Sequence, residues 1–237
     1  MGKDSSQEQR MHRIRIPDHA LRLSRQRGTL ATSLEDVDPL RCALLVIGMQ
    51  SAFVAPGGAL EIVYAREIVP AINRLADAFR QRGATVCWIR TDFRGQADAW
   101  SNWFGRRLDP DAAAVMIKSL PQGHPGYELF PALSVASTDM FSTKTRFSAF
   151  IQGASDLDEV LRGRGVDTVV VTDTVSNICC ESTARDAMML NYRTVFVSDA
   201  NAARTDEEHN ATLGNMVQCF ADVASTDALL QQLNRRT

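Results

Sequence analysis

Short apolar runs that are typical of β-strands alternate along this chain with stretches whose apolar residues recur at helical spacing. One such stretch covers 66–82, and Gly83 is placed to close it as a C-terminal cap. Alternation of this kind favours a mostly parallel sheet with helices on both faces. We therefore expect an α/β fold, a three-layer α/β/α domain around a six-stranded, mostly parallel, doubly wound sheet. The expected strands lie near 42–48, 85–89, 139–143, 168–172, 194–197 and 222–224, and further helices near 157–163, 179–190, after Thr205 and near 226–233.

The chain is long enough to bury one sizeable hydrophobic core. It has 237 residues, of which 45% are hydrophobic, and single α/β domains of this length are ordinary. We expect one domain over 39–237, preceded by an arm and linker over 1–38. The five cysteines are odd in number, lack Cys-x-x-Cys spacing and include an adjacent pair that cannot easily bridge. With no stretch that resembles a signal peptide and no apolar run of about 20 residues, this predicts a cytoplasmic protein.

The arm is locally basic, although the whole chain carries a net charge of only −2. It has no interleaved aromatic residues on which bases could stack. We therefore expect a solvated or subunit-clasping arm in a homo-oligomer, a dimer or a tetramer, with no nucleic-acid or membrane partner. Over 10–27 its basic residues are Arg10, Arg13, Arg15, Arg22, Arg25 and Arg27, against a single acid, Asp18.

A cysteine stands where a strand gives way to a helix. Cys179 comes seven residues after the β-run 168–172 and opens the expected helix. The first turn of a helix leaves backbone N–H groups unpaired and carries the positive end of the dipole, so a thiol there ionises more easily than a free one. A buried structural cysteine is the alternative interpretation.

Three segments together carry a resemblance to a known family. They are the apolar run 43–53, the segment 141–150 with its Lys-x-Arg-x-Ser-Ala-Phe, and the cysteine segment 176–187. At these separations they resemble the isochorismatase-like cysteine hydrolases, which include N-carbamoylsarcosine amidases, biuret hydrolases and ureidoacrylate amidohydrolases. The resemblance implies a metal-independent hydrolase, without a cofactor, that cleaves a small amide, carbamoyl or ureido substrate through a thioester-type intermediate. By position it makes Cys179 the nucleophile and Lys144 its cationic partner.

The chain departs from this family pattern at two strand ends. In the family the first strand ends in a catalytic aspartate, which takes the thiol proton and returns it to the leaving nitrogen. That position is Gly48 here. At the end of the fourth strand the family usually has glycine, where this chain has Asp173. Because these strands are neighbours in the family's sheet, Asp173 is a candidate for the space vacated at Gly48.

The resemblance also implies how the chain stabilises negative charge on a substrate oxygen. The expected oxyanion hole consists of the backbone N–H groups of Val175 and Cys179. A cis peptide bond between Thr174 and Val175 is expected to shape this turn.

A metal site is not expected. The four histidines are scattered, and the segment 91–98 lacks the Asp-x-His cluster that nicotinamidases of this superfamily place there. We expect His124 to be a turn residue and His209 to lie on the surface of a helix.

Three aromatic residues are candidates to wall a small apolar pocket around a planar substrate group, namely Phe53, Trp100 and Trp103. Packing in the core is the alternative for each tryptophan. Both tryptophans lie in the segment 92–136, which shows no clear periodicity. Loops of this length in compact domains are usually lids or binding loops, and we expect one here.

Two arginines are candidates to hold a substrate carboxylate as bidentate forks, Arg146 within the lysine motif and Arg185 in the cysteine segment. Pairing with internal acids such as Glu181 or Asp186 is the interpretation that we favour for both.

Two functions from different classes remain open. The first is the cysteine amidohydrolase described above. The second is a catalytically impaired homologue, or an engineered inactive variant, that binds a ligand without turnover because Gly48 replaces the usual acid. A third hypothesis is that Asp173 supplies the acid that is missing at position 48. If no other acid substitutes, we expect Gly48→Asp to recover activity.

Overall fold

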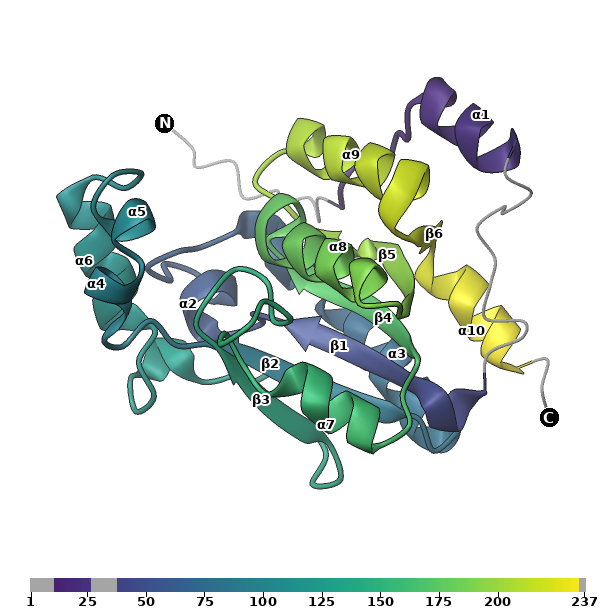
Figure 1. Ribbon diagram of the computed structural model, residues 1–237, viewed down its shortest axis with the longest axis horizontal. Helices are drawn as coiled ribbons and strands as arrows, with labels where there is room; N and C mark the ends of the chain where they lie inside the picture. Colours follow the sequence, from purple (N-terminus) through teal and green to yellow (C-terminus); the bar gives the residue numbers. More distant parts are fainter. Residues whose placement is uncertain (1–10, 27–37, 235–237) are drawn as a thin grey trace, which may run out of the picture.

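The protein forms a three-layer α/β/α domain around a six-stranded parallel sheet (Figure 1). The computed structural model describes residues 11–26 and 38–234. The strand order is β3-β2-β1-β4-β5-β6, and each neighbouring pair is parallel. The strands are β1 (Cys42–Ile47), β2 (Thr85–Thr91), β3 (Met140–Lys144), β4 (Thr168–Thr174), β5 (Arg193–Ala202) and β6 (Asp222–Ala224). This confirms the predicted fold class.

Helices cover both faces of the sheet. One face is packed by α3 and α10, and the other by α1, α7, α8 and α9. The α-helices are α1 (Asp18–Gln26), α2 (Ser51–Val54), α3 (Val69–Gln81), α4 (Gln96–Ala99), α5 (Ser101–Phe104), α6 (Pro110–Ser119), α7 (Leu157–Gly163), α8 (Glu181–Met189), α9 (Asp206–Asn215) and α10 (Thr226–Asn234). Shorter turns are η1 (Pro39–Arg41), η2 (Val63–Arg66), η3 (Pro125–Tyr127), η4 (Ser176–Cys180) and η5 (Met216–Phe220).

The two central strands divide their side chains between two hydrophobic cores. On β1, Leu44 joins the core under α3 while Leu45 joins the core under α8, and on β4 Val170 and Val171 alternate in the same way. Every residue of β1 and β4 is buried. The groups that follow these strands therefore stand on the most firmly packed part of the sheet.

The carboxyl ends of the strands meet where the winding of the sheet reverses, between β1 and β4. In open parallel sheets, ligands bind in the crevice at this point. Gly48 follows β1, Lys144 is the last residue of β3, and Asp173 lies one residue before the end of β4. The fold thus places the residues singled out in the sequence at one edge.

The segment 92–136 is more structured than the sequence predicted. It holds α4, α5, α6 and the turn η3, and Figure 1 shows α4 to α6 beyond the end toward which β1 points. Two of these helices have only 4 residues each, which is little more than one turn and too short to reveal a 3.6-residue period. The longer α6 is capped by Asp109, whose side chain accepts hydrogen bonds from the N–H groups of Asp111 and Ala112.

The arm, as far as it is described, packs against its own domain. Its helix α1, which the sequence analysis did not predict, buries Ala20 and Ser24 and contacts α9 and η5. Preceding residues are tied to α9, because the N–H of Arg13 donates to Asp206 at 3.3 Å and that of Arg15 to Asn210 at 2.5 Å. The rest of the predicted arm, 1–10 and 27–37, lies outside the described residues.

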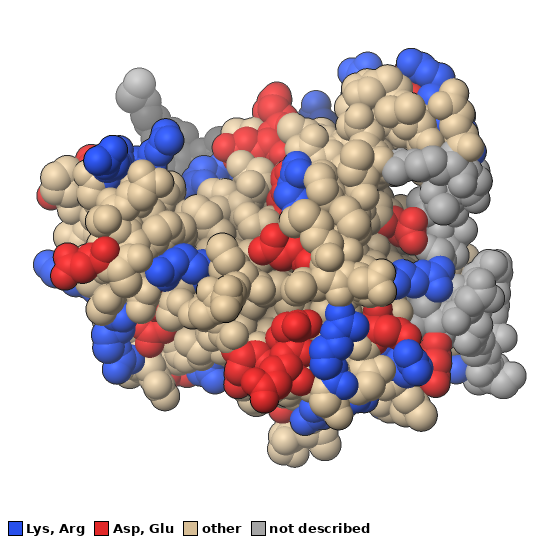
Figure 2. Space-filling view, viewed as in Figure 1, with Lys and Arg blue, Asp and Glu red and all other residues tan. Residues whose placement is uncertain are grey.

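The charges on the face shown in Figure 2 are mixed, with Lys and Arg interspersed among Asp and Glu. Among the described helices, none combines the length and apolar character that crossing a membrane requires.

Candidate active site

A buried lysine at the end of β3 points at a cysteine. Lys144 is fully buried. Its Nζ donates to the carbonyl oxygen of Arg146 at 3.0 Å and to Sγ of Cys179 at 3.3 Å. A buried ammonium requires such partners, because removing it from water is otherwise very costly. The strand therefore fixes a positive charge against the thiol that the sequence singled out.

Cys179 lies in a π-helical turn, η4, between β4 and α8. A cis peptide bond joins Thr174 to Val175 immediately before this turn, where the resemblance placed it. The helical segment begins at Ser176, three residues earlier than the sequence predicted, so Cys179 lies inside its first turn. Single π-helical turns occur frequently at functional sites.

Gly48 and Asp173 face each other across the β1–β4 pair. Gly48 follows Ile47, the register partner of Asp173. It has φ +92°, in the region that favours glycine. A Cβ built on Gly48 would lie 3.3 Å from Oδ2 of Asp173 and 2.9 Å from the carbonyl oxygen of Thr174. The carboxyl of Asp173 thus borders the space in which a side chain at position 48 would begin, as the sequence analysis anticipated.

The Asp173 carboxyl is buried without a hydrogen-bond partner among the described residues. The residue is 0% exposed, and both of its carboxyl oxygens are unpaired. Burial raises the pKa of Asp173 well above its ordinary value, and the Thr174 amide and the Lys144 charge offset only part of this effect.

The neighbouring thiol of Cys180 is held in its neutral form. Cys180 is 0% exposed, whereas Cys179 retains 9% exposure. Burial raises the pKa of Cys180 well above its ordinary value, and the charge of Asp173 adds to this rise. Of the two adjacent cysteines, only Cys179 combines contact with a cation and residual exposure.

An aromatic cluster joins the segment 92–136 to the lysine motif. Phe147 packs edge-on against Trp100 and Trp103, with ring centroids 4.8 and 4.9 Å apart. Both tryptophans are partly buried against the core, and the indole Nε1 of Trp103 is buried without a partner among the residues that the structure describes. Phe53, on α2, is 9% exposed and lies within the core. The two tryptophans therefore lie next to the lysine motif, whereas Phe53 packs as a core residue. Sequence reasoning did not single out Phe147, although the motif that contains it was visible.

The two candidate arginines have different partners. Arg146 donates to Gln96 Oε1 at 2.7 Å and to the backbone oxygens of Thr145 and Ala99, and its guanidinium lies 5.0 Å from the Trp100 ring centroid. The favoured expectation that it pairs with an acid is wrong, because its donors are used to hold the 92–104 segment in place. For Arg185 the same expectation is confirmed, since it binds Glu181 Oε1 at 2.6 and 3.0 Å.

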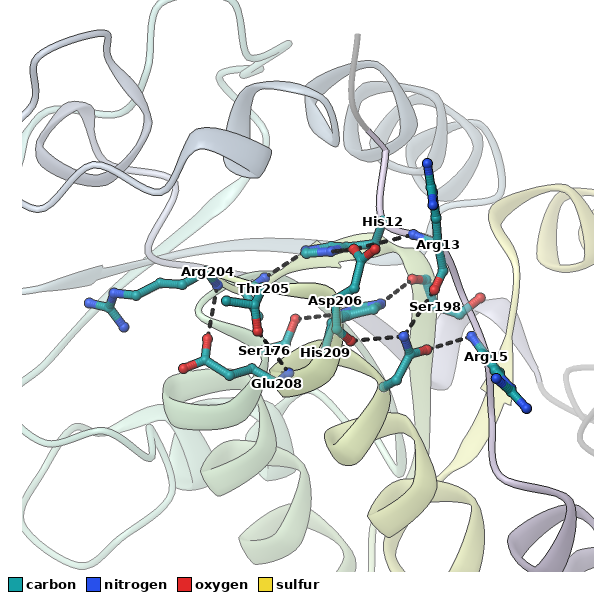
Figure 3. Close-up of polar contacts among 12 residues, drawn as sticks. His12, Arg13, Arg15, Ser176, Ser198, Arg204, Thr205, Asp206, Glu208 and His209 are labelled. Carbon is teal, nitrogen blue, oxygen red and sulfur yellow. Dashed lines mark hydrogen bonds and ion pairs between the residues drawn. The ribbon is translucent and has the colours of Figure 1, made fainter. Parts of the chain in front are cut away.

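His209 contacts Ser176, the first residue of the cysteine turn η4 (Figure 3). Its Nδ1 lies 2.8 Å from Oγ of Ser176, and its Nε2 lies 2.9 Å from the carbonyl oxygen of Ser198. Because a carbonyl can only accept, Nε2 carries the proton and Nδ1 accepts from the serine hydroxyl. The residue is 0% exposed, so the prediction of a helix-surface histidine is wrong. Burial lowers the pKa of His209 to about 4, with His12 adding to the effect.

The arm supplies the partner of this histidine. The His12 ring stacks on His209, with centroids 4.4 Å apart, and on Tyr64 at 4.0 Å. Its Nδ1 lies 2.8 Å from Asp206 Oδ1, and its Nε2 accepts the N–H of Ala203 at 3.0 Å. His12 lies 197 positions before His209, so no local sequence signal could have revealed this contact. His124, in contrast, is the turn residue that was predicted, since its Nδ1 accepts the N–H of Gly126.

The arrangement assembles the parts needed for nucleophilic catalysis. It brings together a thiol, a fixed cation and a carboxyl group that can change protonation, in surroundings that exclude water. Within 11–26 and 38–234, no group of three or more His, Cys, Asp or Glu side chains is placed to hold a metal ion.

Comparison with known proteins places this site in context. The isochorismatase domain family matches residues 42–228. The chain is 33% identical over 204 residues to the ureidoacrylate amidohydrolase RutB of Caulobacter vibrioides, covering 80% of this chain and 90% of that protein. The crystal structure of a cysteine hydrolase from Pseudomonas syringae pv. phaseolicola is similar with a TM-score of 0.75 and 31% identity, covering 84% of this chain and 95% of that one. The N-carbamoylsarcosine amidase from Thermoplasma acidophilum gives a TM-score of 0.62 with 26% identity, covering 79% and 97%.

Proposed function

The chain belongs to the isochorismatase family, and on this premise we propose that it is a cysteine amidohydrolase that cleaves a C–N bond of a small amide, carbamoyl or ureido compound. The observation that carries the proposal is the contact of 3.3 Å between Nζ of Lys144 and Sγ of Cys179. A buried cation against a thiol stabilises the thiolate, which is the nucleophilic form. The names of the two similar enzymes, a ureidoacrylate amidohydrolase and an N-carbamoylsarcosine amidase, support the substrate class.

The chemistry follows from the position of each group. Cys179 attacks the carbonyl carbon of the substrate, and the oxygen gains negative charge that the N–H groups of Val175 and Cys179 stabilise together with Lys144. Loss of the leaving nitrogen gives a thioester on Cys179, which water then hydrolyses. We propose this route without a metal, because the segment 91–98 has no histidine.

The aromatic cluster suits a small, planar substrate. Trp100 and Trp103 pack on Phe147, three residues after Lys144, and flat aromatic surfaces favour a planar amide or ureido group. Arg146 holds Trp100 in place, since its guanidinium lies against the Trp100 ring and binds Gln96 in the same segment.

A second candidate function, ligand binding without turnover, is favoured by one observation. The position that holds the catalytic aspartate in the family is Gly48, and glycine cannot transfer a proton. A chain that has lost this step retains Lys144 and Cys179 and still binds the planar group of a ligand.

Labelling with substoichiometric iodoacetamide, followed by peptide mass spectrometry, tests the assignment of the nucleophile. We expect the label at Cys179, because Cys180 is fully buried and its thiol is neutral. Cys180→Ala is the matched control and should leave both labelling and turnover intact. Label at Cys180 alone contradicts the assignment.

Turnover on a panel of amide, carbamoyl and ureido compounds separates the two candidate functions. The amidohydrolase proposal requires release of ammonia or an amine from at least one member and its loss in Cys179→Ala. Binding of a panel member without release, by a folded protein, supports the binding function instead.

A further inference from the structure

The proposed chemistry needs a group that moves a proton, and the position that supplies it in the family is Gly48. We propose that Asp173 is the acid–base residue of this chain, so that Gly48 and Asp173 form a compensated pair in which one carboxyl group has moved from β1 to β4. This inference rests on the proposed function, because it names the proton-transfer group of the same site.

The first support is the position of the carboxyl group. Across the β1–β4 pair, Asp173 is the register partner of Ile47, the residue before Gly48. Its Oδ2 lies 3.3 Å from where a Cβ on Gly48 would stand. A side chain at position 48 would therefore grow directly into the Asp173 carboxyl, and the two positions share one space.

The second support is that neither carboxyl oxygen has a partner at hydrogen-bond geometry in the described residues, although the adjacent Thr174 amide is near enough to lower the pKa of the carboxyl. Both oxygens are buried and unpaired, whereas most buried polar groups in native proteins are hydrogen-bonded. Its side chain also stands on a backbone with φ +130°, a conformation that an L-residue rarely adopts and that glycine, the usual family residue here, adopts freely. Neither feature favours folding, and unfavourable groups that persist in this way cluster at active sites.

The third support is the electrostatic setting. The charge of Lys144 acts on Asp173, and that of Asp173 acts on Cys180, the residue after Cys179. Lys144 also touches Sγ of Cys179. Because burial raises its pKa, the Asp173 carboxyl binds a proton more readily than an exposed one, as a group that accepts and returns a proton must.

The proton balance of the proposed cycle is complete. The Asp173 carboxylate takes the proton of the Cys179 thiol, directly or through one water molecule, as the sulfur–carbon bond forms. The protonated carboxyl gives that proton to the leaving nitrogen as the C–N bond breaks. Asp173 then takes a proton from the attacking water and returns it to the sulfur as the C–S bond of the thioester breaks.

The pairing changes what is expected of Gly48→Asp. A Cβ at this position would lie 2.9 Å from the carbonyl oxygen of Thr174, closer than real Cβ contacts, on a backbone with φ +92°. It would also bring a second carboxyl beside that of Asp173, and like charges at that distance disfavour one another. The structure thus argues against the expectation that Gly48→Asp alone restores activity.

The direct test uses Asp173→Asn, which keeps the size of the side chain and removes its acid. We expect turnover to fall by about 10²–10⁴-fold, the usual contribution of a positioned acid–base group. The matched control is Thr172→Val, which alters the adjacent buried residue of β4, whose hydroxyl donates to the carbonyl oxygen of Leu45. Turnover of Asp173→Asn within about threefold of the control, with the fold intact by circular dichroism, overturns the proposal.

A readout that needs no substrate separates this proposal from the proposed function. The rate of iodoacetamide labelling at Cys179 is measured against pH in the unaltered chain, in Asp173→Asn and in Thr172→Val. We expect a titration step that Asp173→Asn removes or moves by about one pH unit or more and that Thr172→Val preserves. If no substrate is turned over but this step behaves as expected, the proposed function fails, while Asp173 is still the group whose protonation controls the Cys179 thiol. Superimposable profiles overturn the assignment whatever the turnover.

An exchange cycle tests the compensation itself. Asp173→Gly alone should lose about 10²–10⁴-fold in turnover, and Gly48→Asp alone should not exceed the unaltered chain. In the double variant, a glycine at 173 frees the backbone before Thr174 to shift its carbonyl oxygen away from the new Cβ, and turnover should recover at least about tenfold relative to Asp173→Gly. Independent effects of the two changes, with no recovery in a folded double variant, contradict the compensated pair.

Discussion

Two buried ionisable side chains flank the same cysteine turn, and their surroundings are opposite. Both ring nitrogens of His209 have partners, Ser176 in the turn and the carbonyl oxygen of Ser198, and the ring stacks on His12. Asp173, on the other side, has no hydrogen-bond partner for either oxygen in the described chain. A satisfied buried group contributes to folding, whereas an unsatisfied one is a cost that a function has to explain. The difference assigns His209 to support of the turn and Asp173 to its chemistry.

The two groups also respond to pH in opposite directions. Burial lowers the pKa of His209 to about 4. Between about pH 6.5 and 4 the unfolded chain therefore binds a proton at His209 that the folded protein does not, and the free energy of unfolding decreases as pH falls. Burial raises the pKa of Asp173, so the folded protein keeps a proton that the unfolded chain releases. Asp173 therefore reduces stability as pH rises above the ordinary carboxyl pKa. The pH dependence of stability in acid therefore reports on His209, and the pH dependence of activity reports on Asp173.

The largest effect expected to sharpen this comparison comes from Lys144→Met, which removes the cation that touches Cys179 and acts on Asp173. Turnover should fall by about 10²–10³-fold, comparable to the loss of one charge-stabilising donor. Because the Lys144 charge lowers the pKa of Asp173, the acid limb of the rate profile should also move to higher pH. The measurement is kcat/KM against pH, with the exposed Lys118→Met as control. If the acid limb does not move in an active variant, Lys144 does not control the protonation of Asp173.

The next effect is the acid lability that His209 confers. As pH falls from about 6.5 to about 4, the free energy of unfolding should decrease by up to about 3 kcal/mol, the equivalent of a shift of 2.5 pKa units. Urea unfolding across this range measures it. The slope should be absent in His209→Gln and retained in His124→Gln, which alters an exposed turn. A slope that survives His209→Gln assigns the acid lability to other groups.

A smaller difference distinguishes the two hydrogen bonds of His209. His209→Asn keeps an amide group where Nδ1 stood, within reach of Ser176, whereas His209→Gln keeps one where Nε2 stood, within reach of Ser198. Since an unpaired buried group costs about 1–3 kcal/mol, both variants should be destabilised. If the serine contact holds the turn, His209→Asn should keep about tenfold more turnover per folded molecule than His209→Gln. Equal turnover in the two variants would show that His209 contributes to stability but not to the position of the turn.

The smallest expected effect lies at the arm. His12→Phe keeps a ring between Tyr64 and His209 and removes the hydrogen bonds to Asp206 and Ala203. The free energy of unfolding should fall by about 1 kcal/mol, measured by urea unfolding, while turnover per folded molecule stays unchanged. A loss of turnover at unchanged stability would show that the arm takes part in the reaction as well as in support.

Much of the fold was predictable because it depends on local periodicity. The six strands appear within a few residues of their expected places, and α7 has the expected bounds, because buried strands and amphipathic helices repeat with fixed short periods. The short helices α4 and α5 were missed because one turn shows no period. The arm helix α1 was missed because the sequence analysis considered its charge and not its packing.

The candidate site was predictable in part. The motif spacing identified Lys144 and Cys179, and the resemblance placed the cis bond before Val175. The general tendency of arginine to pair with acids gave the wrong partner for Arg146, whose partners are an amide side chain and two carbonyls. Partners of this kind depend on how a loop folds back, and the sequence carries no spacing rule for them.

By itself, the sequence predicted the parallel α/β sheet, the strand end that carries Lys144 and the strand-to-helix turn that carries Cys179, and it showed glycine at 48 and aspartate at 173. Only the tertiary structure decided that the Asp173 carboxyl borders the vacated space without a partner and that His12 of the arm stacks on His209 behind the turn. The physical reason is the sequence separation over which each signal acts. Hydrophobic periodicity acts over a few residues, whereas these contacts join positions 125 or more apart, which packing alone brings together.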